Sequence, residues 1–169
     1  LTFAAGELSV LVGPSGCGKT TTMKMVNRII EPTTGRILLG GEDVTRVDAD
    51  RLRRRIGYVI QSVGLFPHQS IRANVGTVPR LLGWDRRRIR SRADELLDLV
   101  GLDPARYGGR YPHELSGGQR QRVGVARALA LEPKLIVADE PVSALDVSVQ
   151  AQILNLLEDM KGRYGLTLI

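Results

Sequence analysis

Apolar residues recur along the chain at two spacings, and the alternation between these spacings predicts its elements. Short apolar runs bounded by turn residues are typical of buried strands, and they occupy 8–12, 37–39, 56–60, 135–138 and the end of the chain from Leu166. Apolar residues at helical spacing predict helices after Lys19 up to Pro32, across 70–101, from the capping residue Ser116 to Pro133, and over 149–160. Strands that alternate with helices favour a mainly parallel α/β sheet.

Two of the predicted helices carry a well-defined apolar stripe. One stripe comprises Ile89, Ala93, Leu96, Leu97 and Val100, and the other comprises Val149, Ile153, Leu156, Leu157 and Met160. In both, the apolar residues fall at i, i+4, i+7, i+8 and i+11, which places them on one face of a helix. We therefore expect both helices to pack one face against a core.

The order of elements also predicts how the domain is divided. The run 37–39, the Gly40-Gly41 turn and 43–45 indicate a small antiparallel hairpin. The helix-only stretch of about 70–115 indicates a helical subdomain inserted between two core segments, about 1–69 and 116–169. Because the chain starts without Met and stops in an apolar run, we expect a domain truncated at both ends.

Composition narrows the class of protein without defining its function. The chain has 169 residues, 43% of them hydrophobic, and a formal net charge of +6, which is typical of a single globular domain. One cysteine excludes a disulfide scaffold, and no apolar stretch approaches the roughly 20 residues that span a bilayer. Arginines cluster at 51–55 and 86–92, but the aromatic content of 4% argues against nucleic-acid binding and favours solvated helix faces.

Residues 13–20 contain a complete phosphate-binding motif. The sequence Gly13-Pro14-Ser15-Gly16-Cys17-Gly18-Lys19-Thr20 fits G-x-x-x-x-G-K-[ST] between a predicted strand and a predicted helix. Glycines allow backbone N–H groups to turn toward phosphates, and the following helix directs its positive dipole end at them. We expect Lys19 to neutralise phosphate oxygens and the Thr20 hydroxyl to bind Mg²⁺.

The predicted strand 135–138 delivers two carboxylates to its end. Asp139 and Glu140 follow four apolar residues, and open α/β sheets bind ligands at the carboxyl ends of their strands. We expect Asp139 to hold Mg²⁺ through its water shell and Glu140 to accept a proton from an attacking water.

Residues 115–119 form a second candidate anion-binding segment, which differs from the phosphate loop in having no lysine. Leu115-Ser116-Gly117-Gly118-Gln119 places a hydroxyl, two glycines and an amide at a predicted helix N-terminus. One nucleotide could then be clamped between the loop of one subunit and the helix start of another.

These motifs together resemble the ABC ATPases, over essentially the whole chain. Leu115 to Gln119 is similar to their signature, 13–20 to their Walker A loop, and Asp139-Glu140 to their Walker B pair, while 143–146 resembles the D-loop. The resemblance implies a P-loop NTPase fold, ATP and Mg²⁺ as ligands, and a head-to-tail dimer that closes on ATP. It also implies permease subunits and a solute-binding protein as partners, at the cytoplasmic face of the cell membrane.

The resemblance further assigns roles to individual residues. It implies that ATP is bound by Gly13, Pro14, Ser15, Gly16, Cys17, Gly18, Lys19, Thr20 and Thr21, and from the second subunit by Ser116, Gly117, Gly118 and Gln119. The implied metal ligands are Thr20, Gln61 and Asp139, and the implied catalytic residues are Glu140, Lys19 and Gln61. Gln61 resembles the Q-loop residue that senses the γ-phosphate and couples closure to the permease.

Two further family features fall outside the sequence: an adenine-stacking aromatic residue before the phosphate loop, and a histidine after the strand that starts at Leu166. Phe3 lies too close to the loop for the first role, and His68 and His113 lie elsewhere in the chain. We interpret both histidines as ordinary loop residues. Cys17 we interpret as a small loop residue, although its modification could block phosphate binding.

The transported solute is predicted by likeness alone. Residues 25–32, 57–61 and 78–84 resemble importers of glycine betaine, choline and related quaternary amines, whereas 139–152 resembles oligopeptide and dipeptide importers. We favour osmoprotectant import. The alternatives are a peptide importer, a nucleotide-binding fragment without turnover, and a non-transport ABC ATPase of DNA repair or ribosomes.

Overall fold

A central sheet of three parallel strands organises the chain, in the order β3-β4-β5. The computed structural model describes residues 1–60, 62–143 and 145–169. The strands are β3 (Ile56–Val59), β4 (Leu135–Ala138) and β5 (Thr167–Leu168). Ile56 is paired with Leu135, and Leu135 with Thr167. All three strands therefore end at the same edge, as the α/β pattern predicts.

The predicted hairpin is present but shorter than expected. It consists of β1 (Leu38–Leu39) and β2 (Glu42–Asp43), which pair antiparallel. The prediction that the second strand reaches Thr45 is wrong, because Val44–Arg46 forms the 3₁₀ helix η1. The Asp43 carboxylate accepts hydrogen bonds from the Thr45 N–H at 3.0 Å and from the Thr45 hydroxyl at 2.7 Å, which turns the chain out of the strand.

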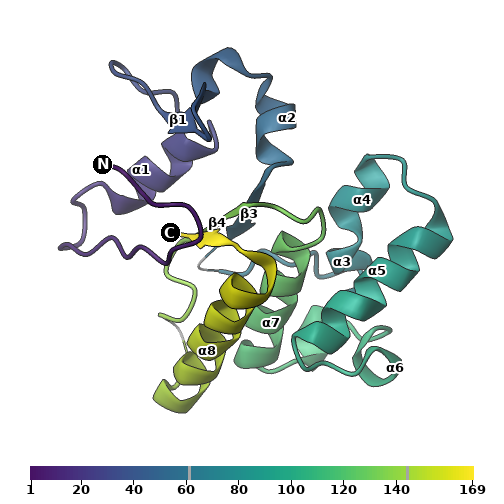
Figure 1. Ribbon diagram of the computed structural model, residues 1–169. Coiled ribbons are helices and arrows are strands. Elements are labelled where there is room, and N and C mark those ends of the chain that lie inside the picture. Colours follow the sequence, from purple (N-terminus) through teal and green to yellow (C-terminus); the bar gives the residue numbers. More distant parts are fainter. Residues whose placement is uncertain (61, 144) are drawn as a thin grey trace.

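Helices lie on both sides of this sheet. They are α1 (Lys19–Val26), α2 (Ala49–Arg53), α3 (Ile71–Val75), α4 (Thr77–Leu81), α5 (Arg86–Leu99), α6 (Pro104–Tyr107), the 3₁₀ helix η2 (Pro112–Glu114), α7 (Gly117–Ala128) and α8 (Val147–Tyr164). Figure 1 shows α3 to α6 grouped on the side of the molecule that lies away from α1. Within the described residues, no helix combines the length and apolarity that a bilayer span requires.

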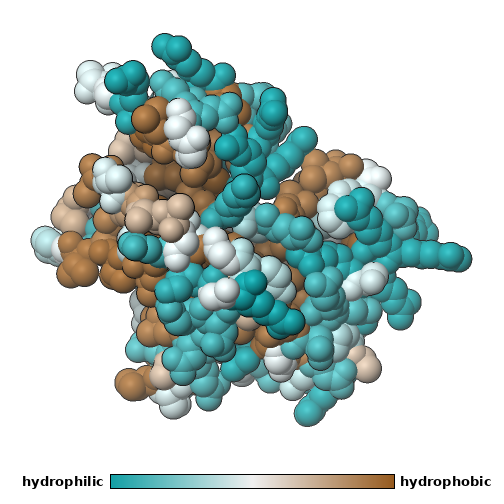
Figure 2. All heavy atoms as spheres, in the orientation of Figure 1, coloured by the Kyte–Doolittle hydropathy of each residue, from teal (hydrophilic) through white to brown (hydrophobic). Residues whose placement is uncertain are grey.

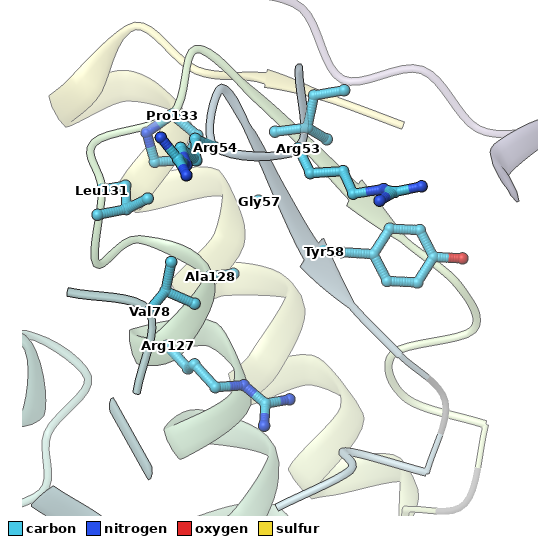
Figure 3. Close-up of a pocket in the computed structure, with 10 residues that line it drawn as sticks. Arg53, Arg54, Gly57, Tyr58, Val78, Arg127, Ala128, Leu131 and Pro133 are labelled. Atoms are coloured by element: carbon cyan, nitrogen blue, oxygen red, sulfur yellow. The ribbon is translucent and has the colours of Figure 1, made fainter. Parts of the chain in front are cut away.

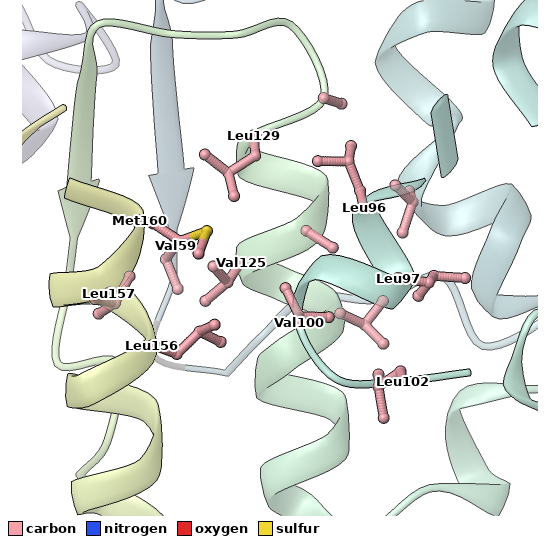
Figure 4. Packing of buried hydrophobic residues seen from close by; sticks show 14 of the residues in the cluster. Val59, Leu96, Leu97, Val100, Leu102, Val125, Leu129, Leu156, Leu157 and Met160 are labelled. Carbon is pink, nitrogen blue, oxygen red and sulfur yellow. The ribbon is translucent and has the colours of Figure 1, made fainter. Parts of the chain in front are cut away.

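The two faces of β4 belong to different hydrophobic clusters. Leu135 and Val137 pack with Met23 of α1 and with Leu52. Ile136 belongs to the larger cluster, which includes buried residues of α5, α7 and α8; Figure 4 shows their side chains interdigitating. Alternate residues of a strand point to opposite faces, so four apolar residues in a row fit a strand covered on both sides.

Both predicted apolar stripes are confirmed as core faces. Ala93, Leu96, Leu97 and Val100 are buried, as are Ile153, Leu156, Leu157 and Met160. The first residue of each stripe, Ile89 and Val149, is half-buried. Burial of such side chains contributes roughly 1.5–3 kcal/mol each relative to exposure. These two helices are therefore held mainly by packing.

The helical stretch 70–101 is interrupted twice. Gly76 ends α3, and a Cβ at this position would lie 2.5 Å from Cγ2 of Ile89, so the chain approaches α5 closely there. The second break precedes α5, where the Asp85 carboxylate accepts a hydrogen bond from the N–H of Arg88 at 2.9 Å and starts a new helix. Local capping thus divides a stretch whose apolar spacing is helical throughout.

Two other helices end earlier than predicted. α1 stops at Val26 and not at Pro32, and α7 stops at Ala128 and not at Pro133. Arg28 and Glu132 have φ values of 55° and 53°, in the left-handed region that interrupts a right-handed helix.

The prediction of a buried strand over 8–12 is wrong. Only Leu8 forms a bridge, to Leu168, and the side chains of Val10 and Val12 are 73% and 90% exposed. β5 provides just two residues for pairing, so the ladder does not extend. Figure 1 places the N-terminal segment on the left of the molecule, and Figure 2 shows apolar side chains gathered on that same side.

We predict that Gly57→Ala destabilises the protein by about 1–3 kcal/mol through overpacking. A Cβ there would lie 2.8 Å from the carbonyl oxygen of Ala128 and 3.0 Å from Cγ1 of Ile136. Because the Ala128 oxygen is a backbone atom, relieving this contact would require the main chain to move. The measurement is urea unfolding. Gly162→Ala in α8 is the control, because its Cβ would meet nothing within 4 Å and it should stabilise by about 0.5–1 kcal/mol. Equal stabilities for the two variants would contradict the prediction.

Candidate functional site

The loop 13–18 turns the chain from the Leu8 bridge into α1. Gly16 and Gly18 have φ values of 81° and 95°, and Gly18 occupies the N-cap position of α1. Glycine adopts this backbone at little cost, whereas a residue with a Cβ is strained there. The glycines at these positions therefore shape the loop at the positive end of the α1 dipole.

Lys19 folds back over this loop. Its Nζ donates to the carbonyl oxygens of Gly13 at 2.7 Å and Pro14 at 3.0 Å. The Sγ of Cys17 lies 3.7 Å from the same nitrogen. The ammonium group is thus fixed beside the loop by backbone oxygens and has no carboxylate among the hydrogen-bond partners found in the described residues.

A hollow of about 390 Å³ lies against the loop. Its lining residues are Gly13, Ser15, Gly16, Gly18, Lys19, Thr20, Thr21 and Glu140. The structure therefore brings together seven of the nine loop residues predicted to bind ATP, with Glu140 from the end of β4. Pro14 and Cys17 are exposed and do not line this hollow.

Thr20 and Asp139 meet although 119 positions separate them. The Thr20 hydroxyl donates to Oδ1 of Asp139 at 3.1 Å. Asp139 follows β4, and its N–H donates to the carbonyl oxygen of Val59 at 2.9 Å, which continues the β3-β4 ladder past the strand. A hydroxyl and a carboxylate are oxygen donors of the kind that Mg²⁺ prefers. Mg²⁺ usually keeps several waters and is bound by one or two protein oxygens together with substrate phosphates, and the Thr20 hydroxyl and the Asp139 carboxylate fit such a donor set.

Glu140 has an unusual backbone conformation. Its φ is 47°, uncommon for a residue other than glycine, and its carbonyl oxygen accepts a hydrogen bond from the Ser143 hydroxyl at 3.2 Å. The chain turns sharply at this residue, which places Glu140 at the wall of the hollow beside Lys19 and Thr20. Such conformations persist where the surrounding structure enforces them.

Tyr58 is a neighbour of Asp139 that the sequence motifs did not reveal. Its hydroxyl oxygen is buried and has no hydrogen-bond partner within the described part of the chain. Burial raises the pKa of the Tyr58 phenol, and the Asp139 carboxylate raises it further. Tyr58 is paired with Val137, two residues before Asp139, so strand alternation already places Tyr58 and Asp139 on one face.

Ser116 begins α7 as predicted. Its Oγ accepts a hydrogen bond from the N–H of Gln119 at 3.3 Å, and Oε1 of Gln119 accepts one from the N–H of Ser116 at 3.0 Å. This reciprocal pair is a capping box. The Gln119 amide also donates to the Tyr107 hydroxyl at 3.2 Å, which connects α7 to α6.

Residues 116–119, which resemble the ABC signature, begin at the exposed Ser116 and lie apart from the phosphate loop. Ser116 is exposed, and Gly117 and Gly118 pack against Leu145 and Val149. None of 116–119 lines the hollow beside Lys19, and Figure 1 shows α1 and α7 well separated. The two predicted phosphate-binding segments therefore do not meet within one chain. The third predicted ligand segment, at Gln61, lies outside the described residues.

Comparison with known proteins shows that the chain is similar to ATP-binding proteins of ABC transporters. The family model described as "ABC transporter" matches residues 1–143. The chain is 51% identical over 169 residues to the osmoprotectant import ATP-binding protein OsmV of Salmonella typhimurium, covering 100% of this chain and 44% of that protein. It is 59% identical over 146 residues to the glycine betaine/carnitine/choline transport ATP-binding protein OpuCA of Bacillus subtilis, covering 86% of this chain and 38% of that protein.

Other relatives differ in the solute that their names give. The chain is 45% identical over 169 residues to the oligopeptide transport ATP-binding protein AppF of Bacillus subtilis, covering 96% of this chain and 51% of that protein. The chain thus spans about half of the length of these curated relatives, or less.

Solved structures share the fold over nearly the whole chain. The dimeric post-hydrolysis state of the ATP-binding cassette MJ0796 bound to ADP and Pi has a TM-score of 0.85 at 34% identity, covering 99% of this chain and 75% of that chain. The cbiO1 structure from Clostridium perfringens has a TM-score of 0.90 at 31% identity, covering 100% and 68%. The predicted P-loop NTPase fold is confirmed.

We predict that Lys19→Met weakens binding of Mg-ATP by about tenfold to a hundredfold, since charge-assisted hydrogen bonds to phosphate are lost. Equilibrium binding of a fluorescent ATP analogue measures the effect. Lys24→Met is the matched control, because Lys24 lies in the last turn of the same helix and outside the lining of the hollow. Equal affinities of the two variants would remove Lys19 from the site.

Proposed function

The chain belongs to the ABC transporter family, and we propose that it is the ATP-binding and ATP-hydrolysing part of an importer for quaternary-amine osmoprotectants such as glycine betaine or choline. The observation that carries the proposal is the meeting of Thr20 with Asp139 at a hollow that Lys19 and Glu140 also line. The solute class is supported by the names of relatives such as OsmV and OpuCA.

In the proposed mechanism the loop 13–18 and Lys19 hold the phosphates of ATP. Backbone N–H groups and the ammonium stabilise the charge that develops on the transferred phosphoryl group. The Thr20 hydroxyl and the Asp139 carboxylate would hold Mg²⁺, which when bound neutralises phosphate charge. Glu140, at the wall of the same hollow, orients the attacking water and accepts its proton. Gln61 remains a predicted ligand and γ-phosphate sensor.

A second copy completes the site in this proposal. Ser116 is exposed, Gly117 and Gly118 are partly exposed, and none of the three lines the hollow at its own phosphate loop, so this segment can approach the nucleotide of a partner subunit. The start of α7 then supplies N–H groups and a positive dipole end. The dimeric relative bound to ADP and Pi supports the formation of such a dimer. We further propose that permease subunits and a solute-binding protein complete the importer, with this domain peripheral on the cytoplasmic face.

A peptide importer is the second candidate. Residues 139–152 resemble the oligopeptide importers, and AppF is 45% identical. In both proposals the site residues bind ATP and not the transported solute, so the two candidates share one ATPase mechanism and differ in the permease and the solute-binding protein.

We predict that Glu140→Gln retains ATP binding and lowers ATP turnover by about 10²–10⁴-fold, because the general base is lost. Phosphate release and nucleotide binding should be measured on the intact protein. Glu158→Gln in α8, where Glu158 pairs with Lys161, is the control and should keep wild-type turnover. A Glu140→Gln rate equal to the wild type would reject Glu140 as the base. Binding without phosphate release by the wild type would favour the non-hydrolysing module.

We also predict that cells expressing the complete transporter accumulate labelled glycine betaine or choline in an ATP-dependent manner and do not accumulate a labelled dipeptide. Uptake by cells with and without the transporter measures this. Dipeptide uptake without betaine uptake would replace the osmoprotectant assignment with the second candidate, the peptide importer.

A further inference from the structure

The loop that follows β3 contains two consecutive residues with left-handed backbone. Val63 and Gly64 have φ values of 58° and 53°. A β-branched residue such as valine is strongly disfavoured there. Tight turns accompany it, since the Val63 N–H donates to the Ile60 carbonyl at 3.0 Å and the Gly64 N–H to the Ser62 carbonyl at 2.7 Å. Some other contact must therefore stabilise this conformation.

Arg127, near the end of α7, provides that contact. Its Nη2 donates to the carbonyl oxygen of Val63 at 2.6 Å, and its Nη1 donates to that of Gly64 at 2.7 Å. One guanidinium thus binds both left-handed residues. One turn earlier, Gly124 lies against the Val63 side chain, where a Cβ would be 3.0 Å from Cγ1 of Val63. The loop is docked on α7 by both contacts.

The chemistry of this contact requires arginine. Burial lowers the pKa of the Arg127 guanidinium, yet arginine stays protonated in proteins, so its charge must be solvated by the groups around it. In the described part of the chain its hydrogen-bond partners are the two loop carbonyls. A planar fork can donate to two adjacent oxygens at once, whereas a lysine ammonium lacks this fixed geometry.

The second half of the loop, from Phe66 to Ser70, is bound by α3. Asn74 of α3 is buried; its Oδ1 accepts from the N–H of Phe66 at 2.7 Å, and its Nδ2 donates at 3.1 Å to the carbonyls of Phe66, Gln69 and Ser70. The loop therefore runs from the end of β3, across Arg127, to an anchor in α3. It joins the edge of the sheet where Asp139 lies to the group of helices α3 to α6.

A hollow of about 220 Å³ adjoins Arg127 on the side of β3. Gly57 and Tyr58 of β3, Val78 of α4 and Ala128 of α7 line it. Figure 3 shows the Arg127 side chain below Ala128, with its guanidinium pointing away from Arg54 and Pro133. The guanidinium therefore points away from the rest of the lining and toward the loop carbonyls that it binds.

We propose that Arg127 is a positioning residue that binds the loop after Gln61 to α7, so that the loop and the signature helix move together when nucleotide binds or is hydrolysed. α7 begins at Ser116, which the proposed function places on the partner's nucleotide, and it carries Arg127 in its last turn. The nucleotide response rests on that proposed function. The docking of the loop by Arg127 does not.

Hydrogen–deuterium exchange and ATPase kinetics test the proposal on the intact protein assembled with its permease. The variants are Arg127→Met and Arg127→Lys. The matched control is Arg122→Met, because Arg122 lies on the same helix and donates to the Val100 carbonyl at 2.7 Å and to Gln152 at 3.1 Å, away from the loop.

Without nucleotide, Arg127→Met should speed amide exchange over 62–66 by about tenfold, because two charge-assisted hydrogen bonds are lost. In turnover, kcat should fall by about tenfold while KM for ATP stays within about twofold, because the phosphate-binding residues are untouched. Arg127→Lys should give an intermediate exchange rate and kcat. Arg122→Met should leave the loop exchange and kcat at wild-type values.

Unchanged exchange over 62–66 in Arg127→Met would overturn the proposal, as would an equal fall of kcat in Arg122→Met. If Arg127→Met does not fold, the Arg127→Lys comparison decides in the same way, because lysine keeps the charge and loses the fork. Failure of the wild type to hydrolyse ATP would overturn the proposed function, and the exchange comparison without nucleotide would still test the docking by Arg127.

Discussion

The hydrogen bond between Thr20 and Asp139 is the constraint on which the site depends. It joins the start of α1 to the end of β4, 119 positions further along the chain, and it forms only if the parallel register of β3, β4 and β5 brings their carboxyl ends to one edge. The bond itself is an ordinary one, worth about 1 kcal/mol net or somewhat more for a charged acceptor. Its position is fixed by the packing beneath it, since α1 is held to β4 through Met23 and Val137.

The helix α7 is also held by contacts distant in sequence, and its start, its length and its end each play a different part. At its start, Ser116 and Gln119 satisfy each other and leave the serine at the surface. Along its length, Val123, Val125 and Ala126 are fully buried in the cluster that also holds α5 and α8. At its end, Arg127 reaches out of that cluster to loop carbonyls. A rigid helix with an exposed start and a bound end can transmit displacement between the two.

Much of this fold follows from local patterns, and the exceptions have identifiable causes. The apolar run Leu135–Ala138 predicted β4 with both bounds correct, because four buried residues between turns have few alternatives. The stretch 70–101 was divided by caps such as Asp85 that periodicity does not detect. The phosphate loop and Asp139 were predicted through their motif. Tyr58 and Arg127 were missed because their roles depend on pairing across strands and on contacts more than sixty positions away; no spacing rule encodes these.

The two-sided burial of β4 has a consequence for how uniformly the candidate site is assembled from one molecule to the next. Leu135 and Val137 face one cluster and Ile136 the other, so a shift of one residue in pairing would exchange the two faces. The same shift would turn Asp139 away from Thr20 and would put either Lys134 in the place of the buried Leu135 or Asp139 in the place of Ala138. Burying an unpaired charge costs free energy, so the charged residues on either side of the apolar run hold β4 in the pairing that brings Asp139 to Thr20.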